Sequence, residues 1–475
     1  MDFNWNYIIH LGILSTAMLA STLIRSKISF FQRFLIPNSL TAGFILLVFY
    51  NYIAPRFFLD TRILGEYVYH LLNLSFIAML LRKTDKRRGG IKTGVYPTSV
   101  GIISQYALQC VLGLLITFLL MNTIYPDLFP AFGYLLPLGF ALGPGQAYAI
   151  GSGWVPMGFL GAESVALTFA AMGFIIGCFG GVFMINMGLR RGWISSDEVK
   201  KIREKGVRSG VLPPKANRPI AGRSTTESEA IDTMTLHVAV VLAVYFLSFG
   251  LLTLLTYLLS FIGELGMELA TNLWGINFVF TAMTTMVVKE IMKKIKVHYI
   301  VDNGMLTRIS GLSVDLMVTS SIAAISLVVV GQFWLPILII SGAGAVTAYF
   351  TLPWISSRMF KDHHFQRTLI LFGASTGTMP TGLALLRVVD PEFETPVAAD
   401  FMYASGIVFF IAIPLILSIN LPAYSAVQDK PIYFLYAVLI SLGYLLYMLI
   451  AYVAVTRRTS FKKAGNIWYH QKKEK

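Results

Sequence analysis

Charged residues are scarce in this chain, and their scarcity sets its class. Asp, Glu, Lys and Arg make up 13% of the 475 residues, and 56% of the residues are apolar. Soluble globular proteins carry about 25% charged residues. A composition this apolar excludes a large water-soluble catalytic domain. A membrane-spanning helix needs ~20 apolar residues, so the chain is long enough for roughly ten spans.

Cysteine is also scarce, and the few thiols lie in apolar sequence. The chain has two cysteines, Cys110 and Cys178. They form no CxxC pattern and no disulfide framework. We therefore expect no cofactor and no transition-metal site. The first basic residue, Arg25, follows the first apolar run, which is unlike a cleaved signal peptide. We expect this run to be retained, with the N-terminus outside.

Apolar runs of spanning length predict an all-α polytopic membrane protein with about eleven transmembrane helices. The runs are Tyr7–Ile24, Ile36–Ile53, Tyr67–Leu81, Val95–Met121, Ala162–Leu189, Met234–Ile262, Asn272–Ile291, Gly311–Val330, Phe333–Trp354, Pro396–Ile419 and Ile432–Val455.

Two further apolar runs, 132–153 and 368–389, are broken by turn-forming residues. The first contains Gly-Pro-Gly and the second contains Gly-Ala-Ser-Thr-Gly-Thr-Met-Pro. Irregular backbone at membrane depth is tolerated where protein or a water-filled cavity satisfies its polar groups. We therefore interpret both runs as re-entrant hairpins.

The basic residues predict the orientation of the chain in a cell membrane. With the N-terminus outside, the predicted cytoplasmic segments hold 34 of the 38 Lys and Arg residues. This distribution follows the positive-inside rule and places the C-terminus in the cytoplasm. Topology and contact with anionic lipids account for the net charge of +14, so we expect no nucleic-acid partner.

The order of spans and breaks divides the chain into two similar halves. Gly145 precedes Glu163 by 18 residues, and Gly377 precedes Glu394 by 17. Five spans per half would give the second half the opposite orientation, which is typical of the inverted repeats of secondary transporters. The predicted organisation is a first repeat (1–190, hairpin 132–153), a cytoplasmic linker (191–233), a second repeat (234–420, hairpin 368–389), an extra span (431–456) and a basic tail (457–475).

The residue types at the two breaks suit a small ligand. Glycines allow a ligand to approach the backbone closely, and proline prevents a continuous helix. Amides at such tips can bind a carboxylate, while hydroxyl and carbonyl oxygens suit a hard cation such as Na⁺. The alternative is that small residues only allow tight helix packing. The predicted substrate residues here are Gly143, Gly145, Gln146, Thr378 and Thr381, and the predicted ion ligands are Gly143, Ser375, Thr376 and Thr378.

Charged residues within apolar runs give further candidates. Asp315 is expected in the first turn of its span and Asp400 well inside another, where either carboxylate can meet a substrate ammonium or Na⁺. Interfacial capping and structural hydrogen bonding are the alternatives. Arg387 can bind a substrate carboxylate or pair with Asp390. Glu163 and Glu394 are expected to begin the helices after the hairpins.

Several stretches resemble the bacterial sodium/glutamate symporter family over about residues 30–420. The stretches are LIPNSLTAGFIL, GFLGAESVALTFAAMGFIIGCFGG, DPEFETPVAADFMYASGIVFFIAIPL and the two tips. The resemblance implies two inverted five-helix repeats, a homodimer and Na⁺-coupled amino-acid uptake by an elevator-type movement. The first tip departs from the family's usual Gly-Gly-His-Gly-Thr and reads Gly143-Pro144-Gly145-Gln146-Ala147.

Two other functions remain open from the sequence. One is a Na⁺- or H⁺-coupled carrier of another small carboxylate, such as a dicarboxylate. The other is an intramembrane enzyme, although no HExxH or GxGD pattern occurs, and we expect no enzymatic activity.

Overall fold

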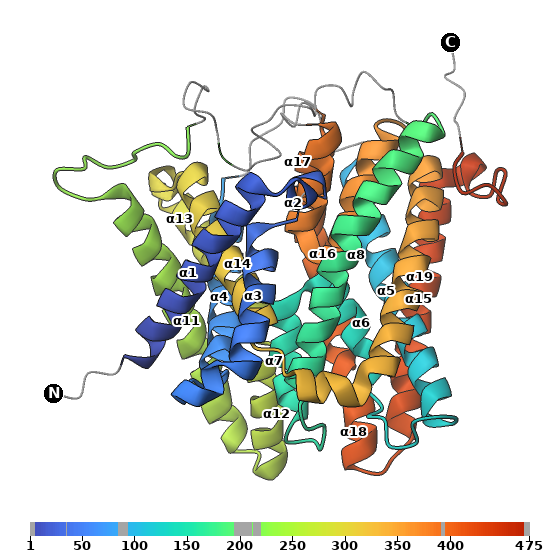
Figure 1. Ribbon diagram of the computed structural model, residues 1–475, viewed down its shortest axis with the longest axis horizontal. Helices are drawn as coiled ribbons and strands as arrows, with labels where there is room; N and C mark the ends of the chain where they lie inside the picture. The colour runs from blue at the N-terminus through green and yellow to red at the C-terminus, as the bar shows by residue number, and fades with distance from the viewer. Residues whose placement is uncertain are drawn as a thin grey trace.

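The computed structural model describes residues 5–34, 36–83, 94–193, 211, 220–390 and 395–469, and every regular element in these ranges is helical (Figure 1). The predicted helix start at Glu394, most of the predicted linker and the end of the tail lie outside the described residues.

The described helices fall into two sets along the chain, one before residue 191 and one after residue 232. The first half contains α1 (Asn6–Lys27), α2 (Ser29–Arg33), α3 (Asn38–Tyr52), α4 (Arg62–Leu81), α5 (Val95–Met121), α6 (Leu135–Pro137), a π-helical turn (Leu138–Leu142), α7 (Pro144–Trp154) and α8 (Ala162–Arg190). The second half contains α11 (Thr233–Ser260), α12 (Glu264–Gly275), α13 (Asn277–Lys294), α14 (Asn303–Ala323), α15 (Leu327–Met359), α16 (His364–Val389), α17 (Val397–Leu417), α18 (Leu421–Val427) and α19 (Ile432–Thr456).

The protein is a multi-pass membrane protein. Nine helical stretches of the described chain are long and apolar enough to cross a membrane: α1, α4, α5, α8, α11, α15, α16, Phe410–Val427 and α19. Three of the eleven predicted spans are not among them. The helix in the second run, α3, has only 15 residues. Charged residues shorten the apolar part of the other two, with Lys289 and Glu290 in α13 and Asp315 in α14.

A capping residue moves one predicted boundary, and a kink lies at another. Asp302 accepts a hydrogen bond from the Met305 amide (2.9 Å), so α14 begins at Asn303, eight residues before the predicted Gly311. Ser326 caps a first short stretch of α15 through the Val329 amide, and α15 is kinked at Phe333 (φ −114°, ψ 16°), where the sequence predicted the span to begin. The sequence predicted Asp315 in the first turn of its span. Because α14 begins earlier, Asp315 lies in the middle of this helix.

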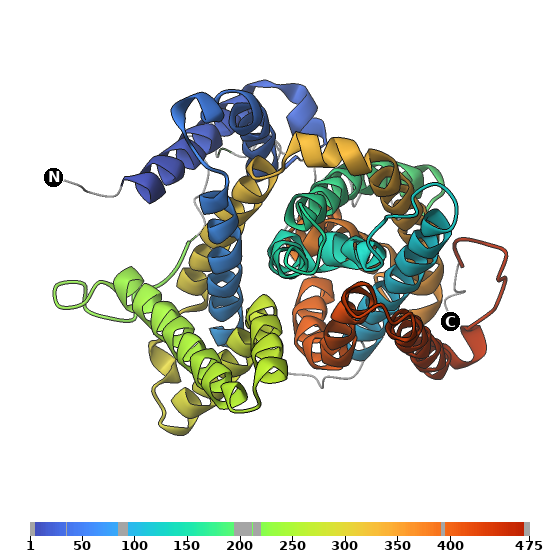
Figure 2. The ribbon, with the colours of Figure 1, turned by 90° about the horizontal axis from the view of Figure 1, so that it is seen from below.

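The helices form two lobes that contact each other along one side (Figure 2). We call the first the flanking lobe; it contains α1, α3, α4 and α11–α14. The second, the tip lobe, contains α5–α8 and α15–α19. The lobes meet mainly where α7 lies against α4, α12 and α14. Each lobe therefore combines helices from both halves of the sequence.

Packing within the lobes pairs helices from the two halves. In the flanking lobe α4 packs against α14, and in the tip lobe α5 packs against α15. The contact of α3 with α14 has a counterpart in that of α13 with α4, and the contact of α8 with α15 has one in that of α17 with α5. Exchanging the two halves thus reproduces these helix contacts.

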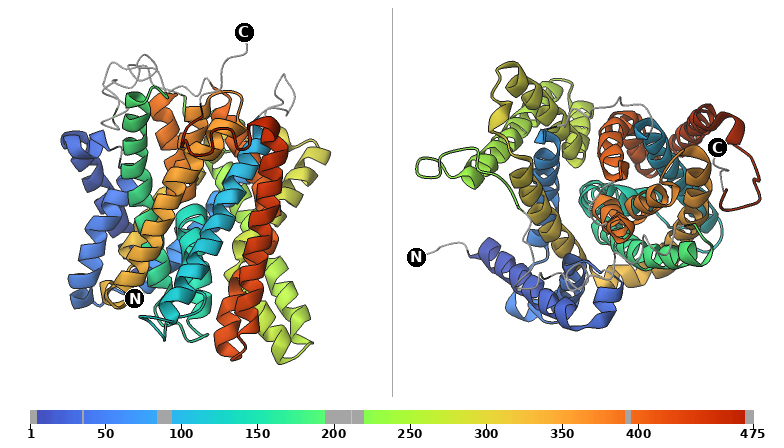
Figure 3. Two further views of the ribbon diagram at one scale, coloured as in Figure 1. Left: turned by 90° about the vertical axis from the view of Figure 1, so that its right-hand side faces the viewer. Right: turned by 90° about the horizontal axis from the view of Figure 1, so that it is seen from above.

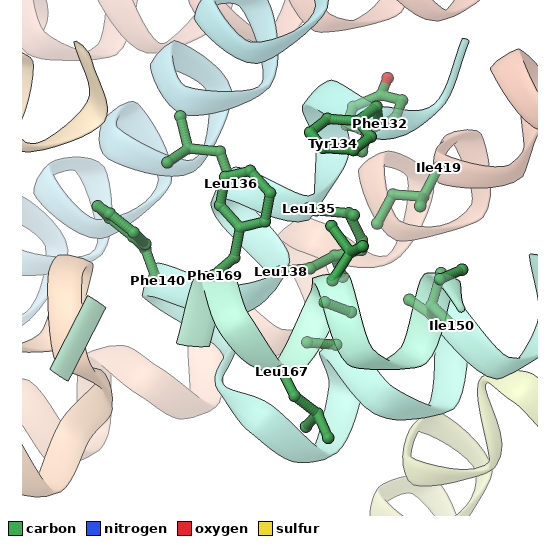
Figure 4. Packing of buried hydrophobic residues seen from close by; sticks show 14 of the residues in the cluster. Phe132, Tyr134, Leu135, Leu136, Leu138, Phe140, Ile150, Leu167, Phe169 and Ile419 are labelled. Carbon is green, nitrogen blue, oxygen red and sulfur yellow. The ribbon is translucent and has the colours of Figure 1, made fainter. Parts of the chain in front are cut away.

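Aromatic and aliphatic side chains bury the first broken segment inside the tip lobe (Figure 4). Phe132, Tyr134 and Phe140 are fully buried, together with Phe169 of α8. In a membrane protein such side chains stabilise the lobe through close van der Waals packing. This packing fixes the position of the break that follows Leu142.

The described C-terminal tail, which follows α19, folds back against the end of α15 (Figure 3). Arg358 at the end of α15 donates to the carbonyls of Lys463 (2.8 Å) and Asn466 (2.9 Å). Trp468 stacks on Trp193, which follows α8. The tail and α19 are therefore attached to the tip lobe.

Candidate functional site

The first break lies at Gly143, between the π-helical turn and α7. Its backbone angles are φ 102° and ψ 178°, in a region that is nearly restricted to glycine. Pro144 then begins α7 with its fixed φ. The amides of Gly145 and Gln146 lie in the first turn of α7, where backbone N–H groups have no helical acceptor. This helix end therefore offers donors and partial positive charge to an anion.

The second break lies within α16. Gly377 (φ −127°, ψ 29°) and Thr378 (φ 69°, ψ 172°) are non-helical. A Cβ on Gly373 would lie 2.6 Å from the Cα of Gly382, although nine residues separate them in sequence. The same separation in a continuous helix spans roughly 13 Å. The two arms of α16, 364–376 and 379–389, therefore lie side by side, and the chain reverses direction at the break.

The two breaks touch each other in the tip lobe. A Cβ on Gly143 would lie 2.6 Å from Cγ2 of Thr378. Thr378 occupies the same glycine-type region of the backbone map as Gly143, which costs a β-branched residue of order 1–3 kcal/mol. The sequence paired Gly145 with Gly377, whereas the equivalent backbone positions are Gly143 and Thr378.

A cavity of about 250 Å³ lies between the lobes beside the second break. It includes three of the predicted substrate residues, Thr378, Thr381 and Arg387. The rest of its polar and charged lining comes from the flanking lobe: Arg25 at the end of α1, Ser39 of α3 and Asp315 of α14. The volume suits a small solute, since pockets for drug-sized ligands run to about 300–1,000 Å³.

Two positive groups and one negative group line this cavity. Arg25 donates from Nη1 to the carbonyl of Ile36 (2.6 Å), which holds its side chain beside the start of α3. Arg387 is on the second arm of α16, and Asp315 is on α14 opposite. Guanidinium groups recognise carboxylates with charge-assisted hydrogen bonds, and a carboxylate can receive an ammonium. The lining can therefore hold a small molecule that carries both charges.

Asp400 lies elsewhere. It is in the first turn of α17, not well inside a span, and is 4% exposed. Its carboxylate accepts a hydrogen bond from Nη2 of Arg367 (3.0 Å), and Arg367 also pairs with Asp362 (2.9 Å). Asp400 therefore belongs to a buried ion pair. It does not line the cavity with the other predicted substrate residues.

The remaining predicted residues surround the breaks. A Cβ on Gly145 would meet Leu72 of α4 at 2.7 Å, so this glycine lies at the contact between the lobes. Gln146 is buried, and its Oε1 has no hydrogen-bond partner among the described residues. Thr376 donates its hydroxyl to the carbonyl of Phe372 (2.8 Å). Glu163 is in the first turn of α8, as predicted.

A second cavity of about 260 Å³ lies between the lobes beyond α7. Its lining includes Gly153 near the end of α7, Gly275 of α12 and Asn420, at the start of α18. Figure 1 shows α12 and α18 at the end of the molecule opposite to the C-terminus. The touching breaks therefore lie between two cavities along the contact of the lobes.

Three residues of the site were not found from the sequence. Arg25 was assigned only to a basic cytoplasmic segment, because nothing in the sequence places the end of α1 beside α16. Ser39 lay within a resembling stretch without an assigned role. Gln109 of α5, which donates to the carbonyl of Ser375 (2.9 Å), is one of two amides in an apolar run. Such an amide within a span was the one available signal.

The chain matches no protein-family model, no curated protein and no solved structure.

Proposed function

We propose that the protein is a secondary active transporter that couples Na⁺ to the uptake of glutamate or a similar amino acid. The observation that carries this proposal is the contact between Gly143 and Thr378, beside a charged cavity between two lobes. Broken helices that meet at the interface of two repeats are typical of substrate sites in secondary transporters. Their helix N-termini favour an anionic group.

The arrangement of the breaks supports re-entrant hairpins as part of the proposal. The arms of α16 have 13 and 11 residues, which correspond to roughly 20 and 16 Å of helix. Each arm is shorter than the ~30 Å hydrocarbon layer. With both broken segments re-entrant and with α3, α13 and α14 crossing, the fold has eleven spans in two inverted five-helix repeats, α19 being the extra one.

Orientation and movement follow from the same topology. The protein lies in the plasma membrane. Its N-terminus is outside the cell, and its basic C-terminal tail is in the cytoplasm. The tip lobe moves as a body relative to the flanking lobe and carries the breaks between the two sides. The flanking lobe provides the fixed surface and, in the proposed homodimer, the contact between subunits.

The cavity lining supports a role for each charged residue in the proposal. Arg25, Arg387 and the break amides bind carboxylates, and Asp315 receives the ammonium in place of Asp400, which is paired with Arg367. The presence of Asp315 favours an amino acid over the alternative, a dicarboxylate without an amine. An intramembrane enzyme remains the minor alternative.

Counterflow in proteoliposomes tests the proposal. Vesicles preloaded with unlabelled glutamate should take up labelled glutamate transiently above equilibrium in the presence of Na⁺. A channel or an enzyme does not produce counterflow, so its absence with glutamate, aspartate and dicarboxylates alike would contradict a carrier.

A further inference from the structure

Two buried oxygens beside the second break lack partners among the described residues and belong to residues that do not line the cavity. Gln109 of α5 and Ser375 of α16 are each 1% exposed. Gln109 Oε1 and Ser375 Oγ have no hydrogen-bond partner among the described residues. Buried polar atoms are almost always satisfied, by protein or by a bound water or ion, so these two oxygens are candidate ligands for such a species.

One hydrogen bond brings these two oxygens together. Gln109 donates from Nε2 to the backbone carbonyl of Ser375 (2.9 Å). This acceptor fixes the orientation of the amide, because a flipped Gln109 would direct Oε1 at another oxygen. The Ser375 hydroxyl is held within about 4 Å of its own carbonyl by covalent geometry. Both unpartnered oxygens therefore belong to one small region.

The backbone beside them adds negative potential. The first arm of α16 ends at this point, because Gly377 and Thr378 are not helical. The Ser375 carbonyl accepts from Gln109 and the Thr376 carbonyl would need the amide of residue 380, which is a proline without an N–H. The C-terminal end of a helix carries a partial charge of roughly −0.5.

We infer that Gln109 Oε1, Ser375 Oγ and the carbonyl end of the first α16 arm bind a monovalent hard cation, Na⁺, behind the second break. Oxygen ligands and a helix C-terminal end suit such a cation. The inference rests on the proposed function and replaces part of the predicted ion site. Of the predicted ion ligands, Thr378 lines the cavity, and the Thr376 hydroxyl already donates to the Phe372 carbonyl. Gln109 was not among the predicted ligands.

This position couples the cation to the substrate. Ser375 is three residues before Thr378, whose strained backbone forms one wall of the cavity. A cation that ties the first arm of α16 to α5 stabilises the break in the conformation that shapes the cavity. The cation is held within the tip lobe and so travels with it, while the substrate is held between the lobes.

The test is the Na⁺ dependence of thermal stability, measured on the purified full-length protein without substrate. Ser375→Ala removes one ligand and keeps the hydrogen bond from Gln109, and Gln109→Met removes the other ligand. Each should raise the Na⁺ concentration for half-maximal stabilisation at least tenfold. Gln105→Met is the matched control, because Gln105 is also buried in α5 and its Oε1 also lacks a partner among the described residues, but its Nε2 donates to Thr351 of α15 (2.9 Å) and not to α16.

The outcomes separate this site from the proposed function. A wild-type response to Na⁺ that survives both substitutions overturns the site, and a buried water on these oxygens would give that result. A wild-type protein with no response to Na⁺, in stability or in transport, contradicts the coupling ion itself. Ser375→Ala alone decides the question if Gln109→Met does not fold.

Discussion

Gly143 and Thr378 have the same unusual backbone conformation and touch each other, one from each half of the chain. Their angles are φ 102°, ψ 178° and φ 69°, ψ 172°. Glycine adopts this conformation without cost, whereas threonine is strained there. Strain of this kind persists where the surrounding structure enforces it, and it is concentrated at functional sites.

The contact between these two residues predicts a coupled stability effect. Gly143→Ala should lower the free energy of unfolding by about 1–3 kcal/mol, because its φ is positive and the new Cβ would lie 2.6 Å from Thr378 Cγ2. Thr378→Gly removes both the strain and the clashing methyl group. The double variant should therefore be more stable than the sum of the single effects by at least about 0.5 kcal/mol in thermal or chemical unfolding. Strictly additive effects would show that the two breaks do not touch.

Arg387 is expected to bind a substrate carboxylate. Arg387→Gln should raise the apparent KM or Kd for the substrate at least tenfold, since a hydrogen bond to a charged group contributes about 1.5–3 kcal/mol. Binding of labelled substrate to the purified protein measures this directly. Arg56→Gln is the control, because Arg56 is exposed and does not line the cavity. Equal affinities in the two variants would place the carboxylate elsewhere.

Asp315 and Asp400 should respond differently to loss of charge. Asp315→Asn should reduce inhibition of transport by amino acids while inhibition by dicarboxylates is retained, because the substrate ammonium loses its partner. Asp400→Asn breaks a buried pair with Arg367 and should therefore lower the melting temperature. It should leave the preference for amino acids over dicarboxylates unchanged. Breaking such a pair typically costs 3–5 kcal/mol, less where Asp362 still pairs with the arginine. A preference that changes with Asp400 and not with Asp315 would reverse the assignment.

Cysteines in the two cavities should be labelled from opposite sides of the membrane. Gly153 lines the cavity beyond α7 and has free space for a Cβ, while Ala384 lines the cavity at the second break. Impermeant thiol reagents should reach Gly153→Cys from outside and Ala384→Cys from the cytoplasm. The native Cys110 and Cys178 are buried and provide a low background. Labelling of both positions from the same side only would contradict two opposed cavities.

Sequence reasoning predicted the helical membrane architecture and located both breaks, because hydropathy and the Gly and Pro residues act locally. It misplaced the start of α14, where the cap Asp302 decides the boundary, and it placed the start of the next span at Phe333, where α15 is kinked. It assigned Asp400 to the substrate because burial of a carboxylate is visible in an apolar run, while its partner Arg367 is 33 residues away. The contributions of Arg25 and Gln109 depend on how distant helices pack, which no local pattern specifies.

Accumulation of labelled glutamate by proteoliposomes under an imposed Na⁺ gradient tests the central claim most directly. With Na⁺ outside and K⁺ inside, the purified protein should concentrate glutamate above its external level, and dissipating the Na⁺ gradient should abolish the accumulation. Uptake that follows a pH gradient and ignores Na⁺, or no uptake above protein-free vesicles, would contradict a Na⁺-coupled amino-acid carrier.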